Sequence, residues 1–235
     1  MKRLLIGISV LANLLTIAGL VALYFMTDGF AFIEKRQARL RSFYEVFPVE
    51  EGDVVFLGDS ITQGAFWGEM FPGASVKNRG IGGDTSQGVL DRLHTITAGR
   101  PAQIFLKIGT NDITALVPKE DIAANVGTII DQIHRESAGT EVYVQSVLPR
   151  DPLLTGSVVE LNALLEPVVR GHGATWVDVF PVFLDAETGA IRRDYANDQL
   201  HLMGPGYVAW RDALRPWVRG AGGRVRVPDL RDPGR

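Results

Sequence analysis

The stretch VVFLGDSITQGAFW, residues 54–67, joins a short apolar run to a helical pattern through the tripeptide Gly-Asp-Ser. Val54 to Leu57 are consecutive apolar residues, as in a buried β-strand, and Gly58 lets the backbone turn sharply after them. Ser60 therefore lies at the carboxyl end of a predicted strand, where α/β folds place functional groups. The alternative is that Ser60 only caps a helix, because serine and aspartate are both good N-caps.

The alternation of strand and helix patterns continues along the chain after Gly52. In the helical segments, apolar residues recur every three or four positions, which puts them on one face. The predicted strands are 54–58, 75–79, 102–109, 141–148 and 174–180, and the predicted helices are 86–97, 119–136, 158–169 and 205–218. Strands that alternate with helices imply right-handed crossovers and a parallel sheet covered on both faces. The sequence thus predicts an α/β fold.

The composition excludes several kinds of site. The formal net charge of −3 gives no electrostatic reason to expect a nucleic-acid partner. The chain has no cysteine, which removes disulfides, thiolate chemistry and cysteine zinc sites. No group of His, Asp and Glu residues has metal-ligand spacing, and neither glycine loop has the Lys-Ser/Thr of a phosphate loop. We expect no metal and no cofactor, and the sequence does not indicate an oligomeric state.

The N-terminal segment has the pattern of a membrane anchor. No charged residue occurs between Leu4 and Met26, and this run is long enough to cross a bilayer. It offers no good cleavage site, so we expect an uncleaved anchor. Lys2 and Arg3 favour a cytoplasmic N-terminus and an exported domain on the periplasmic or extracellular side, whereas the basic residues at 35–41 count against that orientation.

These patterns divide the chain into four parts. We predict a transmembrane anchor at 1–27, a partly helical connector at 28–51, a globular domain at 52–219 and a disordered tail at 220–235. The connector could pack on the domain or lie at the membrane surface. The tail is rich in Gly, Pro and Arg.

Polar and glycine-rich segments follow the predicted strands at the carboxyl edge of the sheet, where ligands of such folds bind. Ser60 follows the first strand, NRGIGGDTS (78–86) the second, and IGTND (108–112), with Asn111, the third. The segment NDQLHLMGPGY (197–207) precedes the last predicted helix. Glycine loops and asparagines are also common in plain turns, so each segment alone is weak evidence.

Asp198 and His201 are spaced for a hydrogen bond between their side chains. A carboxylate three residues before a histidine can accept the Nδ1–H of the ring, which fixes the tautomer and leaves Nε2 free to take a proton from a hydroxyl. The other histidines, at 94, 134 and 172, fall in predicted helices or at a helix end, and we interpret them as structural or surface groups. Asp84 and Asp112 are interpreted as loop or cap residues; Asp178, at the end of the last predicted strand, could neighbour the site, but we interpret it as structural.

Taken together, the blocks GDSIT, GIGGD, GTND and DQLH resemble those of the SGNH (GDSL-type) hydrolase superfamily, over Gly58 to His201. The segments NRGIGGDT, GTND, VLPR and HLMGPGY are similar to the branch of the platelet-activating-factor acetylhydrolase catalytic subunits. This resemblance implies that Ser60 is the nucleophile and His201 its base, oriented by Asp198. It further implies an oxyanion hole made by the N–H groups of Ser60 and Gly83 and the side chain of Asn111.

The serine does not lie in the G-x-S-x-G turn of α/β-hydrolases, which favours a three-layer α/β/α, flavodoxin-like domain with a five-stranded parallel sheet. The resemblance implies a serine esterase acting on short-chain, chiefly acetyl, esters of carbohydrate or lipid through an acyl-serine intermediate. The alternatives are an O-acyltransferase with the same triad, a lysophospholipase or thioesterase, and a non-enzymatic glycan-binding module. Phe66 and Trp67 could line a small acyl pocket or stack on a sugar, or they could be core residues of the first helix.

Overall fold

The computed structural model describes residues 13, 15–17, 19–20 and 31–220. The chain divides into two compact units, Met1–Phe43 and Tyr44–Arg235, and residues 31–46 are helical. Most of the predicted anchor at 4–26, and the predicted tail after residue 220, lie outside the described residues.

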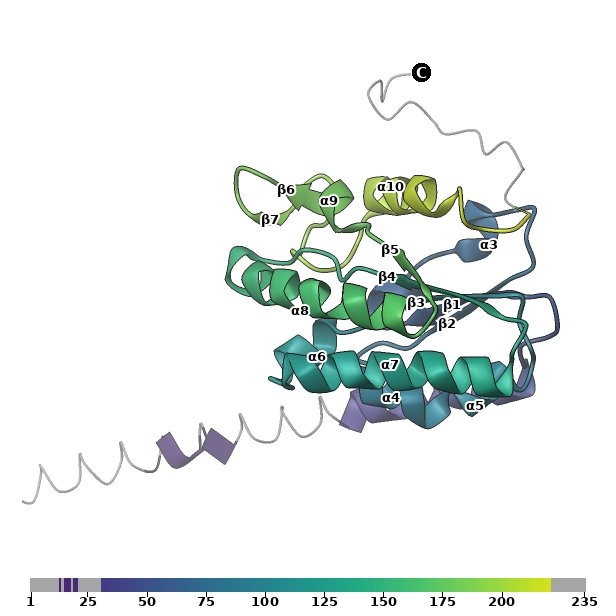
Figure 1. Ribbon diagram of the computed structural model, residues 1–235. Coiled ribbons are helices and arrows are strands. Elements are labelled where there is room, and N and C mark those ends of the chain that lie inside the picture. Colours follow the sequence, from purple (N-terminus) through teal and green to yellow (C-terminus); the bar gives the residue numbers. More distant parts are fainter. Residues whose placement is uncertain (1–12, 14, 18, 21–30, 221–235) are drawn as a thin grey trace, which may run out of the picture. The chain divides into compact units, whose positions relative to one another are not determined.

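The second unit is built on a parallel sheet with the strand order β2-β1-β3-β4-β5 (Figure 1). The strands are β1 (Val54–Gly58), β2 (Val76–Gly80), β3 (Gln103–Lys107), β4 (Glu141–Gln145) and β5 (Thr175–Val177). Gly58 at the end of β1 pairs with Gly80 of β2 and with Lys107 of β3, so these three strands end together at one edge. This order is that of flavodoxin-like folds. The predicted α/β fold with a five-stranded parallel sheet is confirmed.

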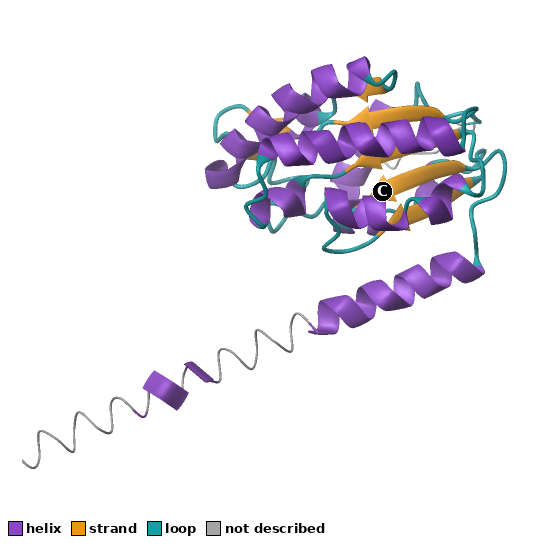
Figure 2. Cartoon of the chain, turned by 60° about the horizontal axis from the view of Figure 1, so that its bottom comes forward, coloured by secondary structure: helices purple, strands orange, loops and turns teal. Residues whose placement is uncertain are grey.

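Helices cover both faces of the sheet (Figures 1 and 2). The helices that follow β1 along the chain are α2 (Ser60–Gln63), α3 (Trp67–Met70), α4 (Ser86–Arg92), α5 (His94–Thr97), α6 (Thr110–Thr114), α7 (Lys119–Glu136), α8 (Pro152–Gly171), α9 (Phe180–Phe183) and α10 (Gly204–Leu214). Alternate residues of β1 point to opposite faces: Val55 and Leu57 join a core under α4, α7 and α8, whereas Val54 and Phe56 join a core under α2, α3 and α10. A small antiparallel pair, β6 (Leu184–Asp185) and β7 (Ala190–Ile191), adds to the second side.

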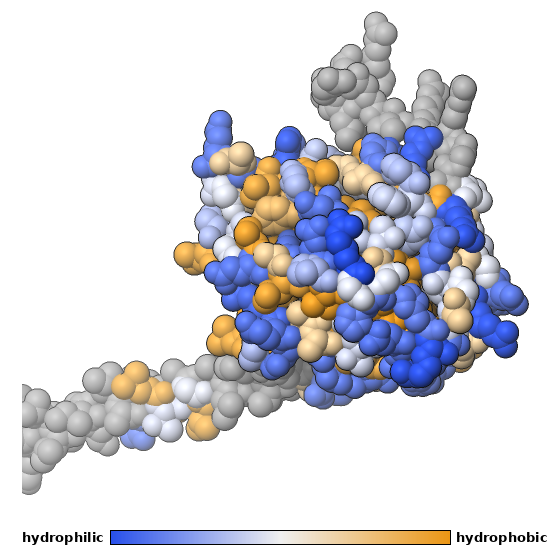
Figure 3. Space-filling model, in the orientation of Figure 1, coloured by the Kyte–Doolittle hydropathy of each residue, from blue (hydrophilic) through white to orange (hydrophobic). Residues whose placement is uncertain are grey.

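Helix α8 is the one helix, among the described residues, that is long and apolar enough to cross a membrane by length and composition. Its inner residues Val158, Leu161 and Leu165 are buried against the sheet and α7. Its outer side faces solvent together with α7, and hydrophilic residues are frequent on the face shown in Figure 3. Helix α8 therefore packs as an amphipathic helix that covers one face of the sheet.

The predicted helix at 86–97 is divided at Leu93 into α4 and α5. The backbone N–H of Leu93 donates to the oxygen of Leu90, and that of Ile96 to the oxygen of Leu93, so this part of the helix is wound more tightly. The hydroxyls of Thr95 and Thr97 also donate to carbonyls of the preceding turn, which competes with regular helix bonds.

Several predicted strands are shorter than expected. The predicted strand at 174–180 ends at Val177 because Ser146 Oγ accepts the N–H groups of Val179 and Phe180, each at 2.8 Å, and these groups no longer join the sheet. The predicted strand at 102–109 ends at Lys107, and Gly109, at φ +125°, begins the turn into α6. Helix α7 is found at the predicted residues 119–136, and α8 begins earlier than predicted because Asp151 caps it and Pro152 starts it.

Candidate active site

Ser60 is the first residue of α2, directly after the turn that ends β1. The N-cap of this helix is Asp59, whose Oδ1 accepts the N–H of Ile61 at 2.9 Å. The capping role is therefore filled by Asp59, and the hydroxyl of Ser60 is available for other contacts. The turn requires glycine at position 58, where an added Cβ atom would overlap the backbone oxygen of Lys107.

The hydroxyl of Ser60 faces His201, which comes from the loop before α10. Ser60 Oγ lies 3.0 Å from His201 Nε2, and His201 Nδ1 lies 2.7 Å from Asp198 Oδ2. Asp198 Oδ1 accepts the backbone N–H of His201 at 2.7 Å and that of Leu200 at 3.0 Å, which fixes the carboxylate. The structure thus brings the three predicted residues into one chain of hydrogen bonds.

The environment of Asp198 favours its ionised form. Partial burial acts to raise the pKa of this carboxyl, but the hydrogen bonds from the His201 ring and from two backbone N–H groups outweigh it, and the pKa lies below its usual value. A carboxylate that stays ionised keeps the Nδ1–H of His201 bound, so Nε2 is the nitrogen that can accept the proton of Ser60.

The glycine loop after β2 lies next to Ser60. A Cβ atom added at Gly82 would lie 3.7 Å from the Cβ of Ser60, and the N–H of Gly82 donates to Gln63 Oε1 at 2.7 Å. Gly83 is exposed and has φ +79°, a conformation that suits glycine. Asn111 Nδ2 donates to the oxygen of Asp84 at 2.8 Å, so the third predicted segment contacts this same loop.

A buried arginine that the sequence did not single out, Arg92, holds the glycine loop in place. The Arg92 guanidinium binds the Asp84 carboxylate at 2.8 Å and donates to the backbone oxygens of Gly58 and Arg79. One side chain of α4 therefore joins the ends of β1 and β2 to the glycine loop. The spacing of apolar residues in this helix does not predict that Arg92 is buried.

Asp112 and Tyr207 make two further links around the site. Asp112, interpreted from the sequence as a loop or cap residue, is buried and accepts the N–H and the hydroxyl of Ser86, which joins α6 to α4. The hydroxyl of Tyr207 donates to the backbone oxygen of Ile61 at 3.1 Å, which joins α10 to α2. Burial, together with the nearby Asp59 carboxylate, raises the pKa of Tyr207 to about 12, so the phenol remains a hydrogen-bond donor.

Trp67 occupies a core position and not the surface of a pocket. Its side chain is buried, stacks on Phe56 with ring centroids 3.6 Å apart and donates from Nε1 to the oxygen of Thr62 at 3.0 Å. Trp67 is thus a core residue, one of the two possibilities that the sequence left open. The adjacent Phe66 is 73% exposed.

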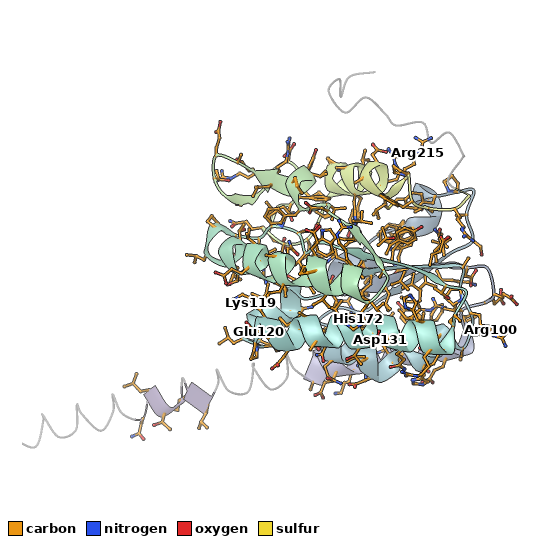
Figure 4. The ribbon with its side chains drawn as sticks, in the orientation of Figure 1. Arg100, Lys119, Glu120, Asp131, His172 and Arg215 are labelled. Carbon is orange, nitrogen blue, oxygen red and sulfur yellow. The ribbon has the colours of Figure 1, made fainter. Side chains whose placement is uncertain are left out.

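Two surface cavities, of about 640 and 610 Å³, lie apart from this site. Arg100 belongs to the first cavity, and Lys119 and Glu120 to the second (Figure 4). Neither lining contains Ser60 or His201.

The other charged groups considered from the sequence make local contacts. His172 at the end of α8 pairs with Asp131 of α7 at 2.7 Å, and both are labelled in Figure 4. Asp178 accepts the N–H of Phe180 at 3.2 Å. Among the described residues, no group of three His, Cys, Asp or Glu side chains could hold a metal ion.

Known proteins share both the sequence pattern and the fold. The GDSL-like Lipase/Acylhydrolase family matches residues 56–209. Platelet-activating factor acetylhydrolase IB subunit alpha1 of Bos taurus is 31% identical over 170 residues, which cover 68% of this chain and 72% of that protein. A Streptococcus pneumonia structure, of a protein proposed to be a platelet activating factor, has a TM-score of 0.76 at 26% identity and covers 82% of this chain and 97% of that chain.

A GDSL-like lipase from Bacteroides thetaiotaomicron has the same fold, with a TM-score of 0.65 at 23% identity over 75% of this chain and 95% of that one. The family match extends from β1 to α10 and so includes Ser60, the glycine loop, Asn111 and the Asp198–His201 pair. The chain therefore belongs to the GDSL-like lipase/acylhydrolase family, within the SGNH hydrolase superfamily, and is a hydrolase.

Proposed function

We propose that this hydrolase cleaves short-chain, chiefly acetyl, esters of carbohydrate or lipid through an acyl-serine intermediate. The observation that carries the proposal is the 3.0 Å contact between Ser60 Oγ and His201 Nε2, with Asp198 on the other ring nitrogen. A hydroxyl becomes an effective nucleophile when an adjacent base accepts its proton. The contact between Ser60 and His201 has the length that this proton transfer requires.

In the first step, Ser60 Oγ attacks the ester carbonyl while its proton passes to His201 Nε2. Asp198 stabilises the imidazolium that forms. The negative charge that develops on the carbonyl oxygen is bound by the N–H groups of Ser60 and Gly83 and by Asn111 Nδ2. An amide nitrogen carries two hydrogens, so Asn111 can donate to the oxyanion and to Asp84 together.

The imidazolium then protonates the leaving alcohol, which departs and leaves the acyl group on Ser60. A water molecule gives its proton to His201 and attacks the acyl-serine, and the return of that proton to Ser60 Oγ releases the acid. An acyltransferase would use the same steps with a sugar hydroxyl in place of water.

The acetyl preference is supported by the relative described as an acetylhydrolase, to which the chain is 31% identical. A lysophospholipase or a thioesterase would use the same triad on a longer chain or a thioester. The uncharged run at 4–26 supports attachment to a membrane, and Lys2 and Arg3 before it favour a domain on the periplasmic or extracellular side.

Two measurements on the full-length chain test the proposal. A fluorophosphonate probe should label the wild-type protein and fail to label Ser60→Ala, and equal labelling of both would contradict the assignment of Ser60. In a series of p-nitrophenyl esters from acetate to octanoate, kcat/KM should fall steeply beyond two carbons. A maximum at octanoate would favour a lipase-like role, and transfer of the acyl group to an added sugar would identify an acyltransferase.

A further inference from the structure

Lys107, the last residue of β3, carries a fully buried ammonium group directly behind the turn that holds Ser60. Its Nζ lies 3.1 Å from Asp59 Oδ2 and 3.3 Å from Asp59 Oδ1. The side chains of Lys107 and Asp59 are 1% and 0% exposed, and the ring of Trp210 lies 5.9 Å from Nζ. The two residues are partners within the described core, not surface groups.

Asp59 connects this ion pair to the backbone of the nucleophile. Its carboxylate also accepts the N–H of Ile61, so it is held on both sides of the turn. The carbonyl of Asp59 and the N–H of Ser60 belong to one planar peptide group, which moves as a unit. An interaction that fixes Asp59 therefore also fixes the direction of the Ser60 N–H and the position of the Ser60 Cα, from which the side chain extends.

The energetics argue that stability is not the reason for this pair. Removing two charges from water is costly, and replacing a buried ion pair by apolar groups of similar size is often neutral or stabilising. Phe105, on the same strand and the same face two residues earlier, is apolar and fully buried, so the surroundings would accept an apolar side chain. The pair lies instead next to Ser60, where a small shift of the backbone would change the position of the reacting hydroxyl.

We propose that Lys107 is a positioning residue, which holds the Asp59 carboxylate and through it aims the hydroxyl and the N–H of Ser60. The inference rests on the proposed function, in which Ser60 is the nucleophile. Lys107 acts through Asp59 and does not itself contact the substrate.

The test compares a double variant, Asp59→Asn with Lys107→Met, with the wild-type full-length chain. The introduced asparagine can still cap α2 and no unpaired charge remains, so the double variant should fold with a urea midpoint close to that of the wild type. The kcat of the double variant for p-nitrophenyl acetate should nevertheless be about tenfold lower than that of the wild type, with KM within about threefold, because the contact serves the transition state and not substrate binding. The rate of fluorophosphonate labelling should fall in proportion to kcat.

Phe105→Leu is the matched control, since it disturbs the same face of β3 without touching Asp59. It should lower the urea midpoint and leave kcat per folded molecule near the wild-type value. A double variant with both the stability and the kcat of the wild type would overturn the positioning role, as would an equal loss of kcat in Phe105→Leu. A wild-type protein that the probe does not label would instead refute the proposed function itself.

Discussion

At the scale of single residues, substitution of Asn111 is the most direct test of the proposed oxyanion hole. Each donor to a developing oxyanion contributes about 3–4 kcal/mol to transition-state stabilisation. We expect Asn111→Ala to lower kcat by about a hundredfold or more while the circular dichroism spectrum is unchanged. The control is Asn125→Ala on α7, where Nδ2 donates only to Ser86 Oγ in the described contacts, and its kcat should change by less than about threefold. Undiminished turnover of Asn111→Ala would remove this residue from the site.

Local patterns and the family resemblance together predict Ser60, Asp198 and His201, and the structure places these three side chains in contact; their catalytic roles stay a prediction. Ser60 follows a strand, and Asp198 precedes His201 by a spacing that allows their 2.7 Å contact. The Lys107–Asp59 pair could not be predicted, because its partners are 48 positions apart and no local spacing connects them. Trp67 was uncertain for a different reason: next to the exposed Phe66, apolar character alone does not tell which ring faces the core.

At the scale of elements, the turn from β1 to α2 is set by the close approach of β3. We expect Gly58→Ala to destabilise the domain by about 3 kcal/mol, because the added methyl would overlap the rigid backbone oxygen of Lys107. It should also displace Ser60 and lower kcat. In Gly68→Ala, within α3, the methyl would meet only Val76 at 4.0 Å, and the helix should gain about 0.5–1 kcal/mol. Urea unfolding of both variants measures the difference, and equal midpoints would contradict the steric argument.

The elements that the sequence predicted well are those with long periodic patterns. Helix α7 carries apolar residues through 18 residues, and its predicted bounds are the observed ones. The short helices α2, α3, α6 and α9 span four or five residues each, too few for a helical period to be recognised. The ends of β3 and β5 were misjudged because side-chain and turn contacts, such as those of Ser146, take backbone groups away from the sheet.

At the scale of the whole molecule, the N-terminal limit of the hydrolase domain determines what can fold alone. The compact unit begins at Tyr44, whose hydroxyl donates to the oxygen of Gly80 at 2.8 Å and whose ring lies 4.6 Å from the Arg79 guanidinium. Val49 is buried in the core beside α4 and α5. A chain that begins at residue 44 should therefore keep the stability of the domain, whereas one that begins at residue 52 loses both buried side chains.

We expect the chain that begins at residue 52 to be less stable than the longer one by about 3 kcal/mol, as for the loss of two buried side chains. Because Gly80 directly precedes the glycine loop, the shorter chain should also turn over p-nitrophenyl acetate more slowly, even at a temperature at which it is fully folded. Urea midpoints and kcat of the two chains provide the measurement. The substitution Glu51→Ala in the longer chain is the control, since Glu51 is exposed and its loss should leave both values unchanged. If the two chains had the same midpoint and the same kcat, the segment from Tyr44 to Val49 would be a connector and not part of the catalytic unit.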